Sequence, residues 1–492
     1  MNRNHLFIAL ALMAAAVLSA CAGGSALSAD DQIATIVAAT LQAGGAPTLS
    51  AEDQIATGVA ATLQAQVAPT DGSIGAQSAF GDCANTGQIS IAYVKDGNVW
   101  IWVQGGPHSQ LTNNGDANDV RISQDGCRIA LMRSVPNPAY DPNVEFPLQS
   151  TFNELWVVNS DGVGLRKMAG QEFFATLPAP AANTAYDLYK FGWQPGSHTL
   201  AFGTRTTFSG PGLAQNNDVY LVNADTAIGP GDIVTLLPMG QGGDFYFSPD
   251  GQQIAFTTST NVSVVDADGG DLRSNLVSFP VVITYSEYLY YPPVHWSPDS
   301  NSFMLAIPPE DGLAPPVNGV YPETLLWYVP LDGTPAFEAG AVQTVWFVTK
   351  EVQFTPDIGR VAYIRQYGEP AANQYELVVA LSNGSNESPT IQSPEITFGD
   401  WGPDNNQYIY FITEGGNLHM WLGNANSPNV TPISGLTPFA AANAEVVWVE
   451  GNSFVQMLLG NAGAELSLME TSGAGAVIDT FANPFVAFDV AN

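Results

Sequence analysis

The sequence predicts an all-β fold built from repeats of about 50 residues, and three observations support this. The segment Phe247-Ser-Pro-Asp-Gly251, followed by the apolar run Ile254-Ala-Phe256, returns in weaker copies through most of the chain. The 48 glycines and 34 prolines supply many turns. Charged residues make up 12% of the chain, about half the roughly 25% of an average soluble protein, so few ion-paired helices are expected.

The chain opens with a segment that has the features of a secretory signal. Arg3 precedes an apolar run over residues 6–18, which is short for a membrane span, and small residues follow it. Leu18-Ser-Ala-Cys21 resembles the lipobox of bacterial lipoproteins, whose cysteine becomes the lipid-bearing N-terminus. The resemblance implies a signal peptide over residues 1–20 and a protein outside the cytoplasm. Lipid on Cys21 would anchor it to a bacterial membrane, at the cell surface or in the periplasm. The alternative is an ordinary signal peptide whose cleavage site includes a cysteine.

Residues 21–79 are expected to form a tether. A 16-residue segment beginning at Ser28 returns almost unchanged at Ser50, a spacing of 22 residues. Each copy opens with Ser and an acid three residues later, a variant of the capping box, and then places apolar residues at every fourth position. This pattern predicts two short amphipathic helices. At about 14 residues each is marginal alone, so a partly disordered spacer is the alternative.

The mature chain has two further cysteines, Cys83 and Cys127. Disulfides persist in the oxidising compartments to which exported proteins belong. Both cysteines fall where turns of the first two repeats are expected, so a disulfide between them would fasten one repeat to the next. Two free buried thiols are the alternative.

The repeated turn predicts the strand layout of each unit. An aromatic or aliphatic residue ends one strand, Pro and Asp-Gly form a tight turn, and an apolar run starts the next strand. The first residues of the successive copies are Ile122, Trp193, Phe247, Trp296, Phe354, Trp401 and Trp448. The steps between them are 71, 54, 49, 58, 47 and 47 residues. A period near 50 with insertions, and four strands in each unit, indicates a propeller or a solenoid.

The Ser-Pro-Asp-Gly turn before Ile-Ala-Phe, with a later strand ending at an Asp-Gly turn, resembles the WD40-like repeats of TolB-type β-propellers. The resemblance covers residues 80–492 and implies a β-propeller domain there. It implies little about activity, because many unrelated functions use this fold. The copies at Ile122 and Trp448 depart from the pattern, with Gln124 in place of Pro and Glu450 in place of Asp, so their turns are expected to differ.

Eight blades are predicted, with seven as the alternative. Residues 89–103 form a further hairpin, which brings the seven copies of the turn to eight units. The inner strand of this first unit is expected either near Phe80 or from the C-terminal segment 485–490. The second option pairs the two ends of the chain and closes the ring, which removes exposed sheet edges.

Long insertions fall in the connections from second to third strand and from fourth to first strand, which emerge on one face of a meander propeller. Binding residues concentrate in loops that a rigid scaffold displays, so this face is the candidate binding surface. It is rich in aromatic residues, whose rings stack on sugars or bury in protein interfaces. The candidate ligand-binding residues are Tyr140, Phe146, Tyr186, Tyr189, Tyr285, Tyr288, Tyr290, Tyr291 and Tyr321. The alternative is that these rings pack their own loops onto the propeller.

Charge and motif content exclude several classes of function. With 13 Lys and Arg against 46 Asp and Glu, the net charge of −33 argues against nucleic-acid binding. The mature chain has four histidines, His108, His198, His295 and His419, never at paired ligand spacing, so neither a metal site nor a cofactor is predicted. No hydrolase elbow or catalytic residue is identified.

Two hypotheses of function follow. The first is an exported, lipid-anchored and non-catalytic binding or scaffold module, which meets a protein or glycan partner through its loop-rich face and the membrane through its lipid. The second is a polysaccharide-active enzyme, a lyase or glycosidase, with its site at the propeller channel. His295 stands on an inner strand and is the histidine best placed to face that channel.

Overall fold

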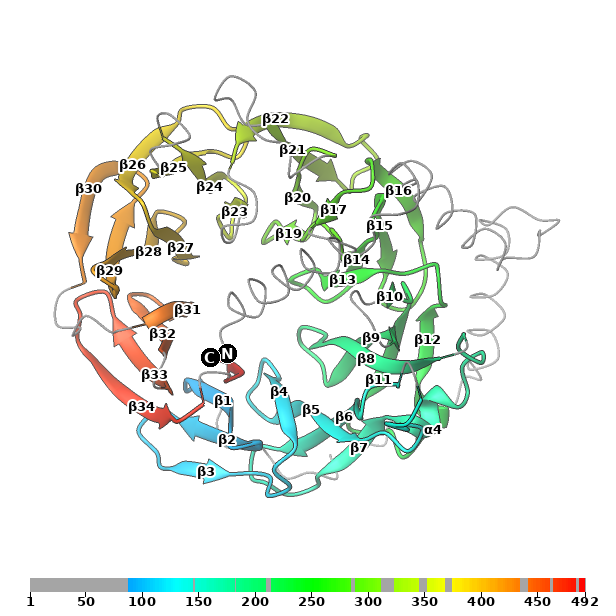
Figure 1. Ribbon diagram of the computed structural model, residues 1–492. Coiled ribbons are helices and arrows are strands. Elements are labelled where there is room, and N and C mark those ends of the chain that lie inside the picture. The colour runs from blue at the N-terminus through cyan, green and yellow to red at the C-terminus, as the bar shows by residue number, and fades with distance from the viewer. Residues whose placement is uncertain are drawn as a thin grey trace, which may run out of the picture. The chain divides into compact units, whose positions relative to one another are not determined.

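The computed structural model describes residues 87–144, 147–181, 183–208, 214–284, 288–310, 323–344, 352–367, 374–433, 441–460, 463–483 and 486–491. These residues form a ring of eight four-stranded antiparallel sheets, which confirms the predicted eight-bladed all-β propeller (Figure 1). The signal segment, Cys21, the tether and Cys83 lie outside the described residues. The disulfide from Cys83 to Cys127 therefore stays a prediction. No helix among the described residues is long and apolar enough to cross a bilayer.

Blade 1 closes the ring by joining the two ends of the chain. From the inside outward its strands are β35 (Phe488–Ala491), β1 (Ser90–Lys95), β2 (Asn98–Val103) and β3 (His108–Gln110). The register pairs Ser90 with Ala491 and Tyr93 with Phe488. Of the two inner strands expected for this blade, the structure has the C-terminal one. Pairing the chain ends satisfies backbone groups that an open ring would expose at a sheet edge.

The other seven blades follow in chain order, each running outward from an inner strand. Blade 2 has β4 (Ala117–Ile122), β5 (Arg128–Pro136), β6 (Thr151–Asn159) and β7 (Arg166–Ala169). Blade 3 has β8 (Thr184–Trp193), β9 (Thr199–Phe208), β11 (Val219–Asn223) and β12 (Val234–Leu237), with β10 (Ala214–Gln215) added beside β9. Blade 4 has β13 (Asp244–Phe247), β14 (Gln253–Thr257), β15 (Asn261–Asp266) and β16 (Arg273–Ser278).

Blades 5 to 8 complete the ring. Blade 5 has β19 (His295–Trp296), β20 (Ser302–Ile307), β21 (Glu323–Pro330) and β22 (Phe337–Gln343). Blade 6 has β23 (Val352–Phe354), β24 (Arg360–Gln366), β25 (Tyr375–Leu381) and β26 (Ser388–Ser393). Blade 7 has β27 (Ile396–Trp401), β28 (Gln407–Glu414), β29 (Asn417–Asn424) and β30 (Ser427–Pro432). Blade 8 has β31 (Ala441–Glu450), β32 (Ser453–Gly460), β33 (Gly463–Glu470) and β34 (Gly475–Phe481).

Short secondary-structure elements lie in the connections between the blade strands. The helix α4 (Gln171–Phe174) follows β7, and the 3₁₀ turn η1 (Pro230–Asp232) precedes β12. The hairpin of β17 (Ile283–Thr284) and β18 (Tyr288–Leu289) stands between blades 4 and 5. We call the surface with the second-to-third and fourth-to-first connections the loop-rich face. The opposite surface, with the first-to-second and third-to-fourth turns, is the turn face.

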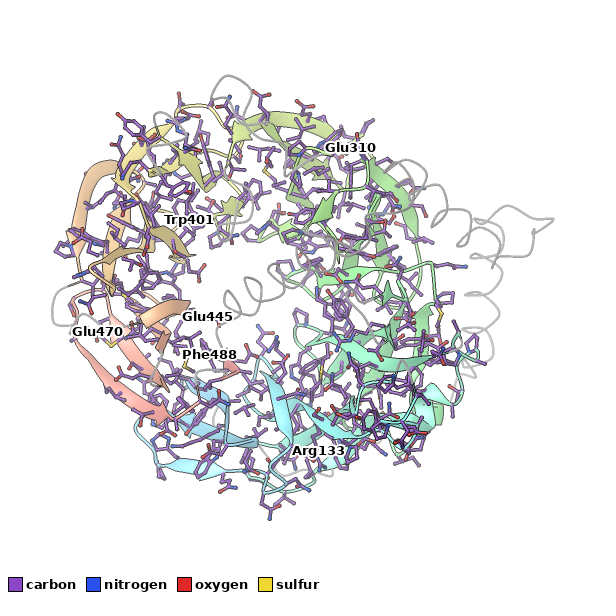
Figure 2. All side chains as sticks on the ribbon, viewed as in Figure 1. Arg133, Glu310, Trp401, Glu445, Glu470 and Phe488 are labelled. Carbon is purple, nitrogen blue, oxygen red and sulfur yellow. The ribbon has the colours of Figure 1, made fainter. Side chains whose placement is uncertain are left out.

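The core lies between neighbouring blades, whose side chains fill the space between adjacent sheets (Figure 2). Met304 and Leu326 of blade 5, for example, pack in one cluster with Val361 and Tyr363 of blade 6, and all four are 1% exposed or less. Central strands such as β20, in which every residue is buried, contribute apolar residues to both faces of their sheet, because both faces are covered by other blades. Since each unit contacts its neighbours, burial accumulates around the ring.

The repeated turn is held by a hydrogen-bond pattern that its residues dictate. Ser248 Oγ donates to Asp250 Oδ1 at 2.6 Å and accepts a bond from the backbone N–H of Gln253 at 2.9 Å. The same pair of bonds recurs around Ser123, Ser297 and Thr355. The turn at Ser123 was expected to differ because Gln124 replaces Pro. It keeps the pattern because Ser and Asp, not Pro, supply the bonding atoms.

The same turns join blade to blade. Asp250 N–H of blade 4 donates to Ser300 Oγ of blade 5 at 3.1 Å, and Asp357 N–H of blade 6 donates to Asn405 Oδ1 of blade 7 at 3.0 Å. Gln194 Nε2 of blade 3 donates to Gly251 O of blade 4. Polar groups of the turn face therefore help to hold neighbouring blades together.

Candidate functional site

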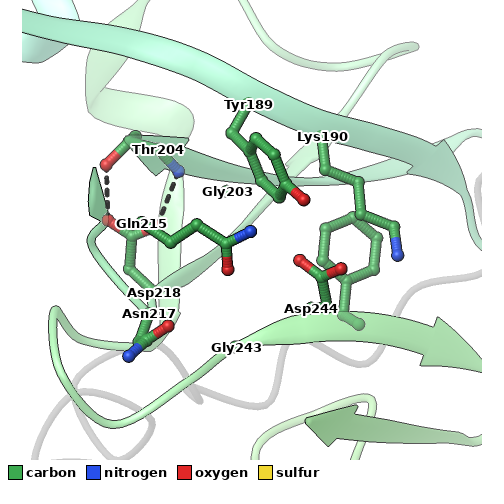
Figure 3. A pocket seen from close by; sticks show the side chains of 10 residues that line it. Tyr189, Lys190, Gly203, Thr204, Gln215, Asn217, Asp218, Gly243 and Asp244 are labelled. Atoms are coloured by element: carbon green, nitrogen blue, oxygen red, sulfur yellow. Dashed lines mark hydrogen bonds between the residues drawn. The ribbon is translucent and has the colours of Figure 1, made fainter. Parts of the chain in front are cut away.

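A small polar recess opens on the loop-rich face between blades 3 and 4 (Figure 3). Its lining residues are Tyr189, Lys190, Gly203, Thr204, Gln215, Asn217, Asp218, Gly243, Asp244 and Phe245. The first two lie in the middle of β8, the next two in the middle of β9, and Gln215 in β10. Asn217 and Asp218 stand just before β11, and the last three residues stand at the start of β13. The connection before β11 and the start of β13 lie on the loop-rich face, so the recess belongs to the face that the sequence indicated.

A β-bulge sets the direction of the β8 side chains. The register between β8 and β9 shifts between Leu188 and Lys190, so Tyr189 is the extra residue. A bulge kinks the strand and re-aims the side chains beside it. The sequence analysis placed Tyr186 and Tyr189 in a loop, and this is corrected: both lie in β8, which pairs with β9 from Thr184 to Trp193. The β-branched run Thr204, Thr206 and Thr207 favours the longer β9 that makes this pairing possible.

On the β9 side of the recess, the Asp218 carboxylate is engaged in hydrogen bonds with Thr204. Asp218 is 2% exposed, and its carboxylate accepts bonds from Thr204 N–H at 2.7 Å and Thr204 Oγ at 2.6 Å. Burial raises the pKa of Asp218, although these bonds oppose the rise. Because both carboxylate oxygens are engaged, Asp218 serves to position the strand ends.

The opposite wall is formed by the start of β13, and the glycine that lets this segment lie close to blade 3 is Gly242. A Cβ added at Gly242 would lie 3.0 Å from the carbonyl carbon of Asp218, whereas a Cβ added at Gly243 would lie 2.1 Å from the carbonyl oxygen of Thr257 in the same blade. The preceding connection is fixed to blade 3 by a hydrogen bond from Gly242 N–H to Asn217 O at 2.6 Å. This geometry brings Asp244 of blade 4 toward Lys190 of blade 3 (Figure 3).

Asp244 and Lys190 carry opposite charges and are both half-buried, yet no ion pair joins them within the described part of the chain. Burial raises the pKa of Asp244, against the attraction of Lys190. Burial also lowers the pKa of Lys190, and Asp244 offsets part of that effect. The Lys190 ammonium lies 3.9 Å from the ring centroid of Tyr246, within range of a cation–π interaction. The Asp244 Oδ1 atom is buried and has no hydrogen-bond partner within the described part of the chain.

Two of the predicted tyrosines meet at this recess. Burial and the Asp244 charge raise the pKa of the Tyr189 hydroxyl above its usual range. Tyr291 reaches the recess from the connection between blades 4 and 5, where its hydroxyl donates to Asn217 Oδ1 at 3.0 Å. Burial raises the pKa of Tyr291 to about 12. Both rings therefore remain neutral hydrogen-bonding groups at physiological pH.

The remaining predicted aromatics are dispersed. Tyr186 is buried, and its hydroxyl donates to Pro178 O at 2.6 Å, so it packs its own connection onto blade 3. Tyr140 is 39% exposed on the connection between β5 and β6. Tyr290 is half-buried, with its N–H bonded to Val282 O at 2.9 Å. Phe146, Tyr285 and Tyr321 lie outside the described residues, as does the side chain of Tyr288.

Lys190, Gln215 and Asp244 were missed by the sequence analysis. A signal for two of them exists, because Lys190 and Asp244 each stand three residues before the aromatic that opens the repeated turn, Trp193 and Phe247. Such positions on adjacent inner strands occupy the same level of the ring. Gln215 gives no comparable signal, because its place depends on the short strand β10.

His295, the histidine that the sequence suggested for the channel, packs against the neighbouring blade. The His295 ring packs at a tilt against Phe354 of the next blade with centroids 5.1 Å apart, and burial lowers the pKa of His295 to about 4. No group of three or more His, Cys, Asp or Glu side chains suited to holding a metal ion is found among the residues that the structure describes.

No family model matches the chain, and no curated protein matches it. Solved structures with similar folds include a eukaryotic initiation factor, with 10% identity and a TM-score of 0.45 over 82% of this chain and 98% of that one. TolB from Acinetobacter baumannii aligns with 12% identity and a TM-score of 0.33, covering 74% of this chain and 83% of TolB. An oligogalacturonate lyase in complex with manganese aligns with 13% identity and a TM-score of 0.39, covering 60% and 84%. These likenesses concern the propeller fold.

Proposed function

We propose that this chain is an exported, lipid-anchored propeller that acts as a non-catalytic binding module for a protein or glycan partner. The observation that carries the proposal is the difference between the two faces of the ring. On the turn face, polar groups such as Asp250 N–H and Gln194 Nε2 are bonded to the next blade. The loop-rich face holds the insertions, an exposed Tyr140 and a recess with polar groups directed into it. Partners bind where a rigid scaffold presents such side chains.

Site-specific photo-cross-linking tests which face is used. A photoreactive residue would replace Tyr140 on the loop-rich face or Val163 on the turn face, in the anchored chain on intact cells. Both positions belong to blade 2 and both are exposed, so they form a matched pair. The proposal expects a discrete adduct, identified as protein or glycan by mass spectrometry, from position 140 only. Equal labelling from both positions, or none from either, would contradict it.

The lipid anchor is tested separately. Replacement of Cys21 by Ala removes the only thiol that the lipobox-like segment offers for lipid attachment. The variant should move from the membrane fraction to the soluble exported fraction, because a lipid chain supplies about 0.8 kcal/mol of membrane affinity per buried methylene group. Unchanged fractionation would overturn the lipoprotein proposal without touching the proposed binding face.

A further inference from the structure

The recess between blades 3 and 4 has the polar groups of a ligand site and few bonds among them. Figure 3 shows the side chains of Tyr189, Gln215 and Asp244 directed toward a common gap, with Lys190 beside Asp244. Among the ten lining residues, the drawn hydrogen bonds join Thr204 to Asp218. Burial, the Asp244 charge and a hydrogen bond between the Tyr189 hydroxyl and the Asp244 carboxyl raise the pKa of Tyr189, so one interaction already joins the two walls. Asp244 Oδ1 is buried there without a partner among the described residues. A buried acceptor without a partner destabilises the fold, and a bound donor would offset that cost.

The chemistry of the gap selects the kind of group that fits. A cation would face the Lys190 ammonium, and an anion would face the Asp244 carboxylate, so neither ion matches both walls. A hydroxyl group donates one hydrogen bond and accepts two, so it can donate to Asp244 and accept from Lys190. The Gln215 amide and the Tyr189 hydroxyl can each donate or accept beside it.

The size of the gap limits what enters it. The enclosed part has room for about one water-sized group, so a single hydroxyl enters and the rest of a ligand stays at the mouth. At that mouth Asn217 holds the Tyr291 hydroxyl at 3.0 Å, which fixes a half-buried aromatic ring beside the recess. An apolar ring next to a set of mixed donors and acceptors matches a sugar, which has apolar ring faces and hydroxyls around its edge.

We propose that the recess binds a neutral saccharide end group, with one sugar hydroxyl inserted between Lys190 of blade 3 and Asp244 of blade 4. This inference rests on the proposed binding function and names the ligand class for one site on the loop-rich face. Lys190 and Asp244 come from different blades, so the site exists only where the ring is assembled.

The test uses the purified full-length chain and an array of neutral oligosaccharides, with positive sugars measured by titration calorimetry. Gln215→Ala removes a lining amide at a half-buried position, and Lys190→Met keeps an unbranched apolar side chain while removing the ammonium that lies over Tyr246. Each variant should weaken binding by about tenfold, the effect of one lost hydrogen bond of good geometry. Val163→Ala, at an exposed position on the turn face of blade 2, should change affinity less than about twofold. Melting temperatures identify any variant that fails to fold, and the half-buried Gln215→Ala provides the result if Lys190→Met unfolds.

The outcomes separate the two proposals. Absence of sugar binding, or sugar binding that the recess variants leave unchanged, would overturn the saccharide site. Competition by inorganic phosphate at equal concentration would also overturn it, because the site would then be an anion site. A protein adduct from position 140 together with no sugar binding would leave the binding module in place and reject only its ligand class.

Discussion

The His198 ring of blade 3 reaches across to blade 2, where its Nε2 lies 2.9 Å from Oδ2 of Asp125 in the preceding turn. Its other nitrogen, Nδ1, lies 2.7 Å from Asp225 Oδ2, and Arg128 of blade 2 donates to the same Asp225 carboxylate at 3.0 Å. A protonated imidazole can donate from both nitrogens, so the network favours the charged ring. It joins blades 2 and 3, the pair separated by the longest step between turns.

We expect this contact to make stability depend on pH. The bonds to Asp125 and Asp225 raise the pKa of His198 above its usual 6.5, so the folded state binds this proton more tightly than the unfolded state. The contribution of His198 to the free energy of unfolding is therefore complete below pH 6.5 and is lost as pH rises through the pKa that His198 has in the folded state.

Burial alone would raise the pKa of Asp125, but bonds from His198, Ser123 and the Cys127 N–H hold that pKa well below its usual range. Asp125 therefore contributes above pH 3.8 and loses its effect only in stronger acid.

The measurement is the melting temperature of His198→Gln against the parent chain. The variant should melt lower at pH 5 and nearly equal the parent at pH 9. His419→Gln is the control, because His419 forms no ion pair within the described residues. A difference for His198→Gln that is the same at both pH values would show that shape, not charge, accounts for its effect.

Glycine substitutions in two equivalent turns isolate a contact between blades. Gly196 and Gly251 both have positive φ, +71° and +70°, so alanine costs about 1–2 kcal/mol at either position. A Cβ at Gly251 would in addition lie 2.5 Å from Pro195 O of the preceding blade, whereas a Cβ at Gly196 meets nothing within 4 Å. Urea unfolding should show a clearly larger loss for Gly251→Ala than for Gly196→Ala. Equal losses would mean that the two blades shift apart at no cost.

Tryptophans of the repeat join blades through their indole N–H groups. Trp401 Nε1 of blade 7 donates to Gln353 O of blade 6 at 3.0 Å, and Trp193 and Trp296 make the same bond to Arg121 O and Tyr246 O. Trp448 of blade 8 is the exception, since its buried Nε1 has no partner within the described residues.

Phe substitutions should therefore have unequal effects. Trp401→Phe removes a hydrogen bond and leaves the Gln353 carbonyl unpaired, for a loss of about 1–3 kcal/mol beyond the change in volume. Trp448→Phe removes an N–H that had no bond, so its loss should be smaller. The free energies of unfolding of the two variants give the comparison, and a larger loss at Trp448 would contradict this explanation of the repeat.

The sequence predicted the ring well because the fold depends on local rules. The Ser-Pro-Asp-Gly turn fixes the register of two strands through bonds within six residues, as around Ser248, so its copies locate the blades. The closing strand β35 was predictable for a similar reason, because an apolar segment at the C-terminus and an unpaired hairpin at residues 89–103 each need a partner.

The recess was not predictable in the same way. It depends on a bulge at Tyr189, on the close approach to blade 3 that Gly242 permits and on the short strand β10, and none of these follows the repeat. The search for aromatics found Tyr189 and Tyr291, but it also included Tyr186, which is buried in its own connection. Residue type indicates what a side chain can do, whereas its direction is set by bulges and by contacts between blades.

The closing strand carries a carboxyl whose charge should oppose folding. Asp489 of β35 accepts a bond from the Ile122 N–H of blade 2 at 2.8 Å, and burial raises its pKa to about 6 from the usual 3.8. The folded state therefore binds this proton more tightly, so stability is greatest below pH 3.8 and is lost as pH rises through 6. A difference of about two pH units corresponds to roughly 3 kcal/mol.

Asp489→Asn keeps an oxygen that can accept the Ile122 bond but cannot ionise. Its stability should equal that of the parent near pH 4 and exceed it increasingly from pH 5 to 7, with a plateau above.

Asp479→Asn is the matched control, for which the opposite pH dependence is expected. Burial alone would raise the pKa of Asp479, but Lys95 and the Thr480 N–H lower it, so this carboxylate stabilises the fold above pH 3.8. Its removal should cost stability at pH 7 and little in strong acid. Thermal melts of both variants from pH 3 to 8 give the curves, and a destabilised Asp489→Asn at pH 7 would show that the charge of Asp489 supports ring closure.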